Sequence, residues 1–321
     1  MITEVGILGF GHALPDTVRH NDDPLFAGLP QAAGSPFTGF RERRVLAAGE
    51  RVETLGLRAA QAALADAGVA AGAIDRLYGA VSPAEHVMPS GLFALHAELG
   101  LRRDATVVPI HSEFTNFVVA LTSACEAVAA GRCERALVVV AAGWSRLVDY
   151  ADAGALGIGD GAGAVVVGRG GSLRFVDEIG ETHGELHAAM TLQFRPPRRA
   201  AEPGADPRLT FVFEAPARRV YDELGTAAPS RLWSALLARH GLSPAEVALV
   251  THQPNRTALD AWQRLLGPAE LPSVVETLGN CTLATSAIVL SLHARALQSR
   301  HLVLLGLGCG QNFAALLLRR A

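Results

Sequence analysis

The sequence predicts an α/β fold in which buried strands alternate with helices. Half of the 321 residues are hydrophobic and only 18% are charged, so the chain has enough apolar sequence for a large core. Several short apolar runs do not alternate with polar residues, which is typical of strands covered on both faces. Segments with a helical period separate these runs. Together the two patterns predict mixed or parallel sheets with helices on their faces.

Seven apolar runs are expected as strands in chain order. They cover residues 5–11, 76–82, 105–110, 136–143, 162–168, 247–253 and 302–310. The clearest helix includes Phe117, because apolar residues recur with the helical period as far as Val128 and a glycine, Gly131, follows. Cys125 is expected on the buried face of this helix. From about residue 181 to 232 the pattern lapses into Pro- and Arg-rich sequence, which predicts exposed loops.

The two halves of the chain echo each other weakly. At 132–145 and again at 298–310, an apolar strand follows a helix and closes on a Gly-containing loop. An internal duplication with a join near residues 170–175 explains this echo economically. We therefore expect an N-terminal half at 1–172 and a C-terminal half at 173–321.

Composition argues against several classes of partner. The formal net charge of −3 provides no basic patch of the kind that nucleic acids require, and it argues against binding to anionic membranes. The N-terminus lacks the features of a signal peptide, and no apolar run reaches the roughly 18 residues of a membrane helix. We expect a cytoplasmic protein without nucleic-acid or membrane partners. The four cysteines lack metal-binding spacing, so we expect reduced thiols, no metal and no cofactor.

Polar residues at strand ends are the candidates for chemistry. His252 follows a buried apolar run, and a neutral imidazole there can donate a hydrogen bond or accept a proton. Asn280 precedes a helix, where it is either an ordinary N-cap or an amide that donates to an oxyanion. Gly308 and Cys309 belong to a Gly-rich segment whose backbone N–H groups can bind developing negative charge.

Taken together, these motifs resemble the β-ketoacyl carrier-protein synthase III group of the thiolase superfamily. The segments that match, in the family's order, are TGFRERR (38–44), GDGAGAVVV (159–167), HQPN (252–255), GNCT (279–282) and GLGCGQNF (306–313). They span essentially the whole chain. The resemblance implies a thiolase fold, which has five layers, αβαβα, built from two duplicated halves.

The resemblance also implies roles for single residues. In the family a Cys takes the acyl group, while a His and an Asn stabilise the thioester enolate during decarboxylative condensation; His252 and Asn280 match the last two. Asn255 belongs to the supporting turn of the same motif. Family members are obligate dimers, and Met88 matches a residue that reaches the partner's substrate pocket. The implied partners are an acyl thioester on a carrier protein or coenzyme A, a small-molecule acceptor and a second subunit in a homodimer.

The family's Cys does not carry over to this chain. Counting back from Phe117 puts Phe114 at the Cys position, and a phenyl ring cannot attack a thioester. The coenzyme A pocket also differs from that of the family, because Phe37 stands where the family has Arg, and Ala33 or a neighbour stands where it has Trp. These departures favour specialised metabolism, such as acyl transfer or condensation in natural-product assembly, over fatty-acid initiation.

The interpretation that we favour from the sequence is an acyltransferase or ketosynthase that works without a Cys acyl-enzyme. His252 deprotonates an acceptor or polarises a thioester, while Asn280 and backbone N–H groups stabilise the oxyanion. Decarboxylation of a malonyl-type thioester is a related reaction for the same two residues. Glu113 is a candidate assisting base, and it is equally well explained as a capping or salt-bridge residue.

Three alternatives stay open. In one, another residue is the nucleophile; the candidates are Cys281, Cys309 and Ser112. In the next, the chain is a catalytically silent subunit or binding partner that forms a heterodimer with a Cys-bearing relative, and Phe114 plugs the acyl tunnel. In the last, Phe114 is an engineered replacement of the Cys.

Overall fold

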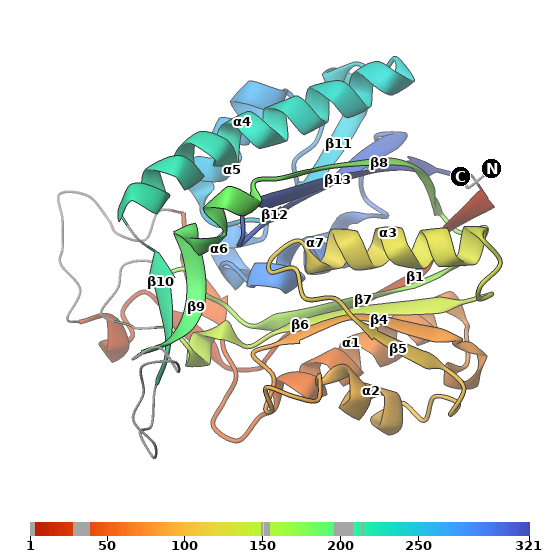
Figure 1. Cartoon of the computed structure of the whole chain (residues 1–321), viewed down its shortest axis with the longest axis horizontal. Helices are drawn as coiled ribbons and strands as arrows, with labels where there is room; N and C mark the ends of the chain where they lie inside the picture. The colour runs from red at the N-terminus through yellow and green to blue at the C-terminus, as the bar shows by residue number, and fades with distance from the viewer. Residues whose placement is uncertain (1–3, 28–38, 149, 151–154, 196–207, 214) are drawn as a thin grey trace.

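The computed structural model describes residues 4–27, 39–148, 150, 155–195, 208–213 and 215–321. Figure 1 shows five layers, with a layer of strands on each side of a central helical layer. The helices α3 and α7 form this central layer, α1 and α2 cover one outer face, and α4 and α5 cover the other. This is the layered arrangement expected from the sequence.

The first strand layer and its helices come from the N-terminal part of the chain. The strands are β1 (Val5–Ala13), β4 (Arg76–Ser82), β5 (Thr106–Pro109), β6 (Ala136–Ala142) and β7 (Gly161–Arg169). The helices are α1 (Val52–Ala67), α2 (Leu92–Glu98) and α3 (Asn116–Ala129). Strand β4 lies between β5 and β6 and is parallel to both, whereas β7 pairs antiparallel with β1 and β6.

The second layer comes from the C-terminal part. Its strands are β8 (Leu173–Thr182), β11 (Val247–Thr251), β12 (His301–Gly308) and β13 (Asn312–Arg320). Its helices are α4 (Ala215–His240), α5 (Arg256–Leu266), α6 (Val275–Leu278) and α7 (Thr285–His293). Two small antiparallel pairs complete the described strands, namely β2 (Val18–His20) with β3 (Glu42–Arg44) and β9 (Met190–Arg195) with β10 (Arg208–Phe213).

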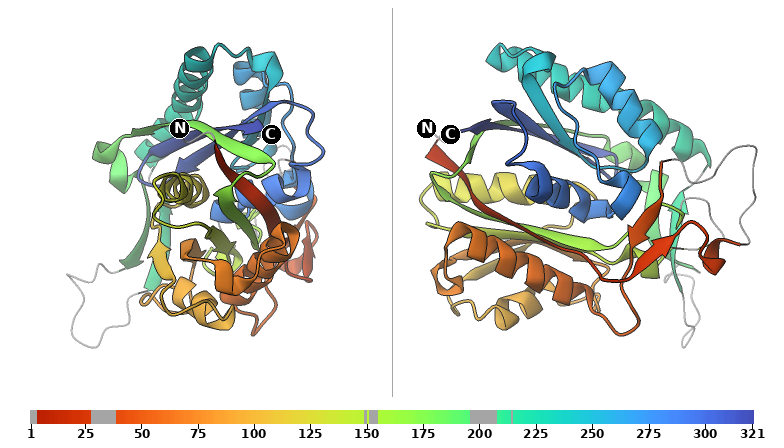
Figure 2. Two further views of the ribbon diagram at one scale, coloured as in Figure 1. Left: turned by 90° about the vertical axis from the view of Figure 1, so that its right-hand side faces the viewer. Right: turned by 180° about the vertical axis from the view of Figure 1, so that it is seen from behind.

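Hydrogen bonds join the two strand layers at one edge. The order through both layers is β11-β12-β13-β8-β1-β7-β6-β4-β5. The pairing of β1 with β8 is short, because it joins only Gly6 with Arg174 and Ile7 with Leu173. The layers diverge beyond this junction, and α7 lies between them against β1, as the view from behind shows (Figure 2).

The apolar runs form strands because they are buried on both faces. Every residue of β6 is buried, as all but the last residue of β7 are. Helix α3 is buried on most of its surface, since strands cover it from both sides, and Cys125 lies in this core as expected. All seven predicted strands are present in the structure.

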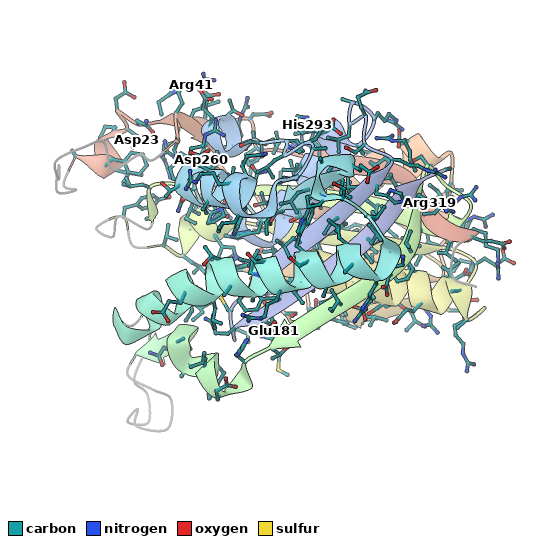
Figure 3. The ribbon with its side chains drawn as sticks, turned by 90° about the horizontal axis from the view of Figure 1, so that it is seen from above. Asp23, Arg41, Glu181, Asp260, His293 and Arg319 are labelled. Carbon is teal, nitrogen blue, oxygen red and sulfur yellow. The ribbon has the colours of Figure 1, made fainter. Side chains whose placement is uncertain are left out.

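The prediction of exposed loops between about 181 and 232 is wrong for much of that segment. Strands β9 and β10 and most of α4 lie within it. The sequence pattern did not predict helix α4 because Pro229 lies inside it, and Pro normally ends or kinks a helix. Helix α4 is tied to the end of β8, where Arg231 donates from Nε to Oε2 of Glu181 at 3.1 Å. Figure 3 shows Glu181 beside α4.

Candidate active site

The bend between β5 and α3 presents Phe114 and is held by a network of short polar side chains. Ser112 Oγ lies 2.7 Å from Thr115 Oγ1. Asn312, at the start of β13, donates from Nδ2 to Ser112 Oγ at 2.9 Å and accepts from Thr115 Oγ1 at 3.2 Å. The C-terminal half of the chain therefore fixes the bend that carries Phe114. Ser112 is fully engaged in this network.

The ring of Phe114 lies between two other rings. It meets Trp144 edge-on, with the ring centroids 5.2 Å apart, and it stacks on His252 with the centroids 6.0 Å apart and an interplanar angle of 7°. Trp144 follows β6, and His252 follows β11 from the other strand layer. The bend and His252, which lie far apart in sequence, are thus neighbours in the structure.

Burial and one hydrogen bond define the state of His252. Its side chain lies in the interior with 4% of its surface exposed, and burial lowers the pKa of the imidazole to about 4. Nδ1 lies 3.2 Å from the backbone oxygen of Thr282. Because a carbonyl oxygen only accepts, Nδ1 must carry the proton, and Nε2 is left with a free lone pair. His252 is therefore a neutral imidazole with a basic nitrogen at Nε2.

The same residue, Thr282, also orients Asn280. Its backbone N–H donates to Asn280 Oδ1 at 2.9 Å, so the Nδ2 group of the amide faces away from this contact. Among the residues that the structure describes, the Asn280 side chain makes this one hydrogen bond, through Oδ1, and none through Nδ2. Gly279 precedes Asn280 with φ at +70°, and a Cβ there would collide with the backbone oxygen of Gly157. The main chain thus holds Asn280 with a free donor.

The loop after β12 lies against the Phe114 bend. A Cβ added to Gly308 would lie 2.9 Å from the Glu113 carbonyl oxygen and 2.9 Å from the Phe114 nitrogen, so only glycine allows this approach. The next residue, Cys309, lies with its Sγ 3.2 Å from Sδ of Met190. Five predicted site residues, Glu113, Phe114, His252, Asn280 and Gly308, thus lie on segments that converge here.

Comparison with known proteins identifies the family. Residues 110–183 match the model of 3-oxoacyl-[acyl-carrier-protein (ACP)] synthase III, and residues 237–320 match the model of its C-terminal part. Beta-ketoacyl-[acyl-carrier-protein] synthase III of Sodalis glossinidius is 31% identical over 98% of each chain. The chain belongs to the β-ketoacyl-[acyl-carrier-protein] synthase III family. The enzyme of the same name from Serratia proteamaculans is also 31% identical, with 98% of each chain covered.

A solved synthase III structure supports the same assignment. The crystal structure of 3-oxoacyl-(acyl carrier protein) synthase III from Pseudomonas aeruginosa PAO1 has a TM-score of 0.85 and 28% identity, with 99% of this chain and 98% of that chain covered. The α/β thiolase fold predicted from the sequence is thereby confirmed.

The cysteines of this synthase III relative are poor candidates for a nucleophile. Burial raises the pKa of the Cys281 thiol far above its usual range, and its Sγ faces the backbone oxygens of Asp160 and Leu278. Burial raises the pKa of Cys309 to about 12, with a smaller contribution from the Glu113 carboxylate. Both thiols are therefore protonated near neutral pH, and a thiol attacks thioesters slowly in that form.

Other predicted residues have structural explanations or lie at the periphery. Asn255 is the N-cap of α5, because its Oδ1 accepts from the backbone N–H of Ala258 at 2.9 Å. The Glu113 carboxylate lies 3.6 Å from Nδ1 of the exposed His111. Met88 is 81% exposed. The coenzyme A positions Ala33 and Phe37 lie outside the described residues.

Sequence reasoning missed a group of buried polar atoms around the site. Three side chains near Phe114 and His252 carry buried atoms without a hydrogen-bond partner among the described residues: Asn116 Oδ1, Thr282 Oγ1 and both amide atoms of Gln311. Gln311 is fully buried and lies between the Gly308 loop and Asn312. Unpaired buried polar atoms are costly, so these three side chains are candidates for hydrogen bonds with a ligand or with water. No periodic pattern in the sequence distinguishes such residues.

The lowered pKa of His252 predicts a pH-dependent stability. The unfolded chain has the ordinary imidazole pKa of 6.5 and the folded chain one of about 4, so between these values only the unfolded chain takes up the proton. The contribution of His252 to the free energy of unfolding therefore decreases as the pH falls from about 6.5, and the loss reaches roughly 3 kcal/mol once the pH is below 4. Urea unfolding at pH 7.5, 5.5 and 4.5 measures the loss, which should be smaller in His252→Gln. An equal loss in both proteins would contradict the assigned state of His252.

Proposed function

We propose that this protein is an acyltransferase of specialised metabolism that moves an acyl group from a thioester directly to a hydroxyl or amine. His252 is the general base, Asn280 helps to bind the oxyanion, and no Cys acyl-enzyme forms. Phe114 occupies the position at which the family's nucleophile is expected. The observation that carries the proposal is the contact between His252 Nδ1 and the Thr282 carbonyl oxygen, because it leaves Nε2 free to accept a proton.

The proposed reaction needs one proton acceptor and one oxyanion site. The acceptor's oxygen or nitrogen attacks the thioester carbonyl carbon while Nε2 of His252 takes its proton. Nδ2 of Asn280 and the backbone N–H of Cys309 donate to the oxyanion. The carbon–sulfur bond then breaks, the leaving thiolate receives the proton from His252, and the acyl group remains on the acceptor.

The protonation of His252 favours this transfer over decarboxylation of a malonyl thioester. An enolate oxygen needs hydrogen-bond donors, whereas Nε2 carries a lone pair. Transfer to an alcohol or amine needs a base, which Nε2 provides.

Several features of the partners are part of the same proposal. The relatives' names describe synthases that act on acyl carrier protein, and we propose a carrier-protein or coenzyme A thioester as the donor here. We propose a homodimer in which the exposed Met88 contacts the partner's pocket. We also propose that residues 1–172 and 173–321 are the two duplicated halves.

The experiment combines a transfer assay with intact-mass analysis. Purified protein is incubated with acyl thioesters and a panel of small alcohols and amines. His252→Ala and Asn280→Ala should each lower the transfer rate at least a hundredfold with the fold intact, while Asn255→Asp, which keeps the N-cap of α5, should leave it nearly unchanged. No acyl adduct should accumulate on the wild-type chain. An adduct that disappears in Cys281→Ala or Cys309→Ala would sink the mechanism.

The second candidate is a silent subunit that pairs with a Cys-bearing relative. The observation in its favour is the stacking of Phe114 on His252, which is 4% exposed. This candidate predicts no turnover by the protein alone and turnover after co-expression with such a relative. Under it, His252→Ala would leave the activity of the complex unchanged, whereas the acyltransferase proposal requires a loss.

A further inference from the structure

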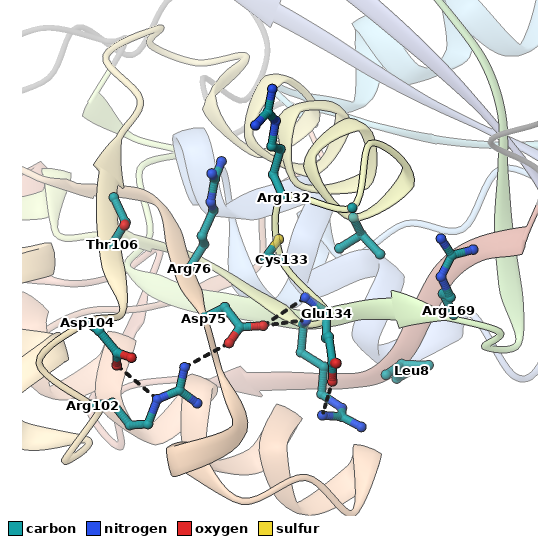
Figure 4. Close-up of a pocket in the computed structure, with 13 residues that line it drawn as sticks. Leu8, Asp75, Arg76, Arg102, Asp104, Thr106, Arg132, Cys133, Glu134 and Arg169 are labelled. Carbon is teal, nitrogen blue, oxygen red and sulfur yellow. Dashed lines mark hydrogen bonds and ion pairs between the residues drawn. The ribbon is translucent and has the colours of Figure 1, made fainter.

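A polar groove lies at the far end of the N-terminal strand layer from Phe114 and His252 (Figure 4). Its volume is about 690 Å³. It opens where the parallel strands β4, β5 and β6 begin, whereas Phe114 and Trp144 follow the ends of β5 and β6. The seven residues of β6 place roughly 23 Å between the two sites. The groove is therefore separate from the candidate active site.

Five arginines line the groove, and three of them face carboxylates. The pairs are Arg102 with Asp75 and Asp104, Arg135 with Glu134, and Arg169 with Glu4. Asp75 is already engaged by other groups, because Oδ1 accepts from Arg102 and Oδ2 accepts from the backbone N–H groups of Glu134 and Arg135. Three of the roughly four acceptor positions of this carboxylate are therefore in use.

The two remaining arginines, Arg76 and Arg132, have no carboxylate within ion-pair distance among the described residues. Figure 4 shows both side chains extending in the same direction from the groove floor near Cys133, away from Asp75. Arg76 is held in place, since Nη1 donates to the hydroxyl of Tyr78 at 3.0 Å and Tyr78 is only 4% exposed. Two like charges thus share one rim in a chain whose net charge is −3.

We propose that Arg76 and Arg132 bind the phosphate group of a small phosphorylated molecule or free inorganic phosphate. A guanidinium presents two parallel N–H donors that match two oxygens of a phosphate, so two guanidiniums can neutralise a dianion. The hydroxyl of Thr106, on the same wall, adds a further donor. The volume leaves room for an organic group beyond the phosphate.

The rim favours a small anion over an acidic protein surface. Asp104 and Glu134 have side chains that are 76% and 86% exposed, so they would repel a broad acidic face laid across the groove. A single phosphate can approach the two free guanidiniums without contacting these carboxylates.

The dipole of a helix explains the position of only one of the two arginines. Arg132 follows the C-terminal end of α3, where a cation is stabilised by the helix dipole. Arg76 starts β4 and is fixed by the Tyr78 phenol, so the helix does not explain its position. The proposal therefore requires the two residues to act together on one ligand.

The test is calorimetric titration of the full chain at constant low ionic strength. The probes are inorganic phosphate and adenosine monophosphate, which distinguish free phosphate from a phosphate ester. Arg76→Gln/Arg132→Gln should weaken binding of the preferred probe at least tenfold. The control Arg58→Gln/Arg264→Gln removes the same two charges from exposed positions on α1 and α5 and should bind as the wild type does. Equal weakening in both double variants, or none in either, overturns the proposal.

A charge-conserving variant separates a built site from general attraction. Arg76→Lys/Arg132→Lys keeps both charges but lacks the paired donors, so phosphate binding should weaken severalfold. Binding as tight as that of the wild type would show that charge alone acts, and the assigned geometry would be wrong. Thermal unfolding of each variant without ligand verifies that the fold is retained.

Discussion

Replacing Phe114 with Cys is expected to create a protein that takes up one acyl group from an acyl thioester. The new thiol would lie two residues before α3, where the helix dipole favours a thiolate, and beside the neutral ring of His252, whose Nε2 can accept the thiol proton. Intact-mass spectrometry after incubation with an acyl-coenzyme A measures the adduct. The wild type should show none, because a phenyl ring offers no nucleophile.

Two variants separate the nucleophile from the space that the smaller side chain leaves. Phe114→Ala opens a similar cavity without a thiol and should show no adduct. Phe114→Cys combined with His252→Ala should react at least tenfold more slowly than Phe114→Cys, because the proton acceptor is gone. Phe114→Ala and Phe114→Cys are each expected to lose about 2–4 kcal/mol of stability, because both remove the ring contacts of the partly buried Phe114. A folded Phe114→Cys protein that stays unmodified would show that residue 114 is not the family's nucleophile position.

The strands were predictable from the sequence because each follows from a local run of apolar residues. The family was predictable because its motifs occur in a fixed order along the chain. Continuous apolar runs such as residues 136–142 are buried on both faces, so they need no knowledge of their neighbours. Strand β8 was missed because exposed and charged residues interrupt its apolar residues. Strand β13 was missed although its apolar run from Phe313 to Leu318 is continuous, because the prediction for this segment ended with the Gly-rich motif at 306–313. Helix α4 was missed because of its internal proline, which a long packed helix tolerates.

The chemistry of the site was only partly predictable, since it depends on contacts between distant segments. The motif HQPN indicated His252, but its proton position depends on a carbonyl oxygen 30 residues away. Asn280 was predicted either as an N-cap or as an oxyanion donor. The N-cap residues of the turn and the helix that follow are Cys281 and Ala284, and the bond from the Thr282 N–H to Asn280 Oδ1 leaves Nδ2 for the second role. The Asp160 carboxylate accepts hydrogen bonds from the backbone of Leu46 and Ser145, and nothing in the sequence indicated these contacts beyond the glycine-rich motif that contains Asp160.

Substitution of Asp160 by alanine is expected to destabilise the fold strongly. The carboxylate is completely buried, and it accepts from the backbone N–H groups of Leu46 and Ser145 and from the Ser145 hydroxyl. Burial raises its pKa against the lowering effect of these bonds. Alanine leaves three donors without an acceptor, which should cost roughly 3–5 kcal/mol in urea unfolding. Because Ser145 adjoins Trp144, the contact of Trp144 with Phe114 should loosen as well.

An isosteric variant tests the reason for this loss. Asp160→Asn keeps the shape, and the Ser145 hydroxyl can rotate to accept from the new Nδ2, but the Leu46 N–H cannot reverse its role. Its stability should therefore lie between those of the wild type and Asp160→Ala. The exposed Asp104, which pairs with Arg102 at the surface, serves as the control, and Asp104→Ala should show no measurable change. If Asp160→Asn were as stable as the wild type, the explanation would be wrong, because the backbone N–H donors would then not require a carboxylate at this position.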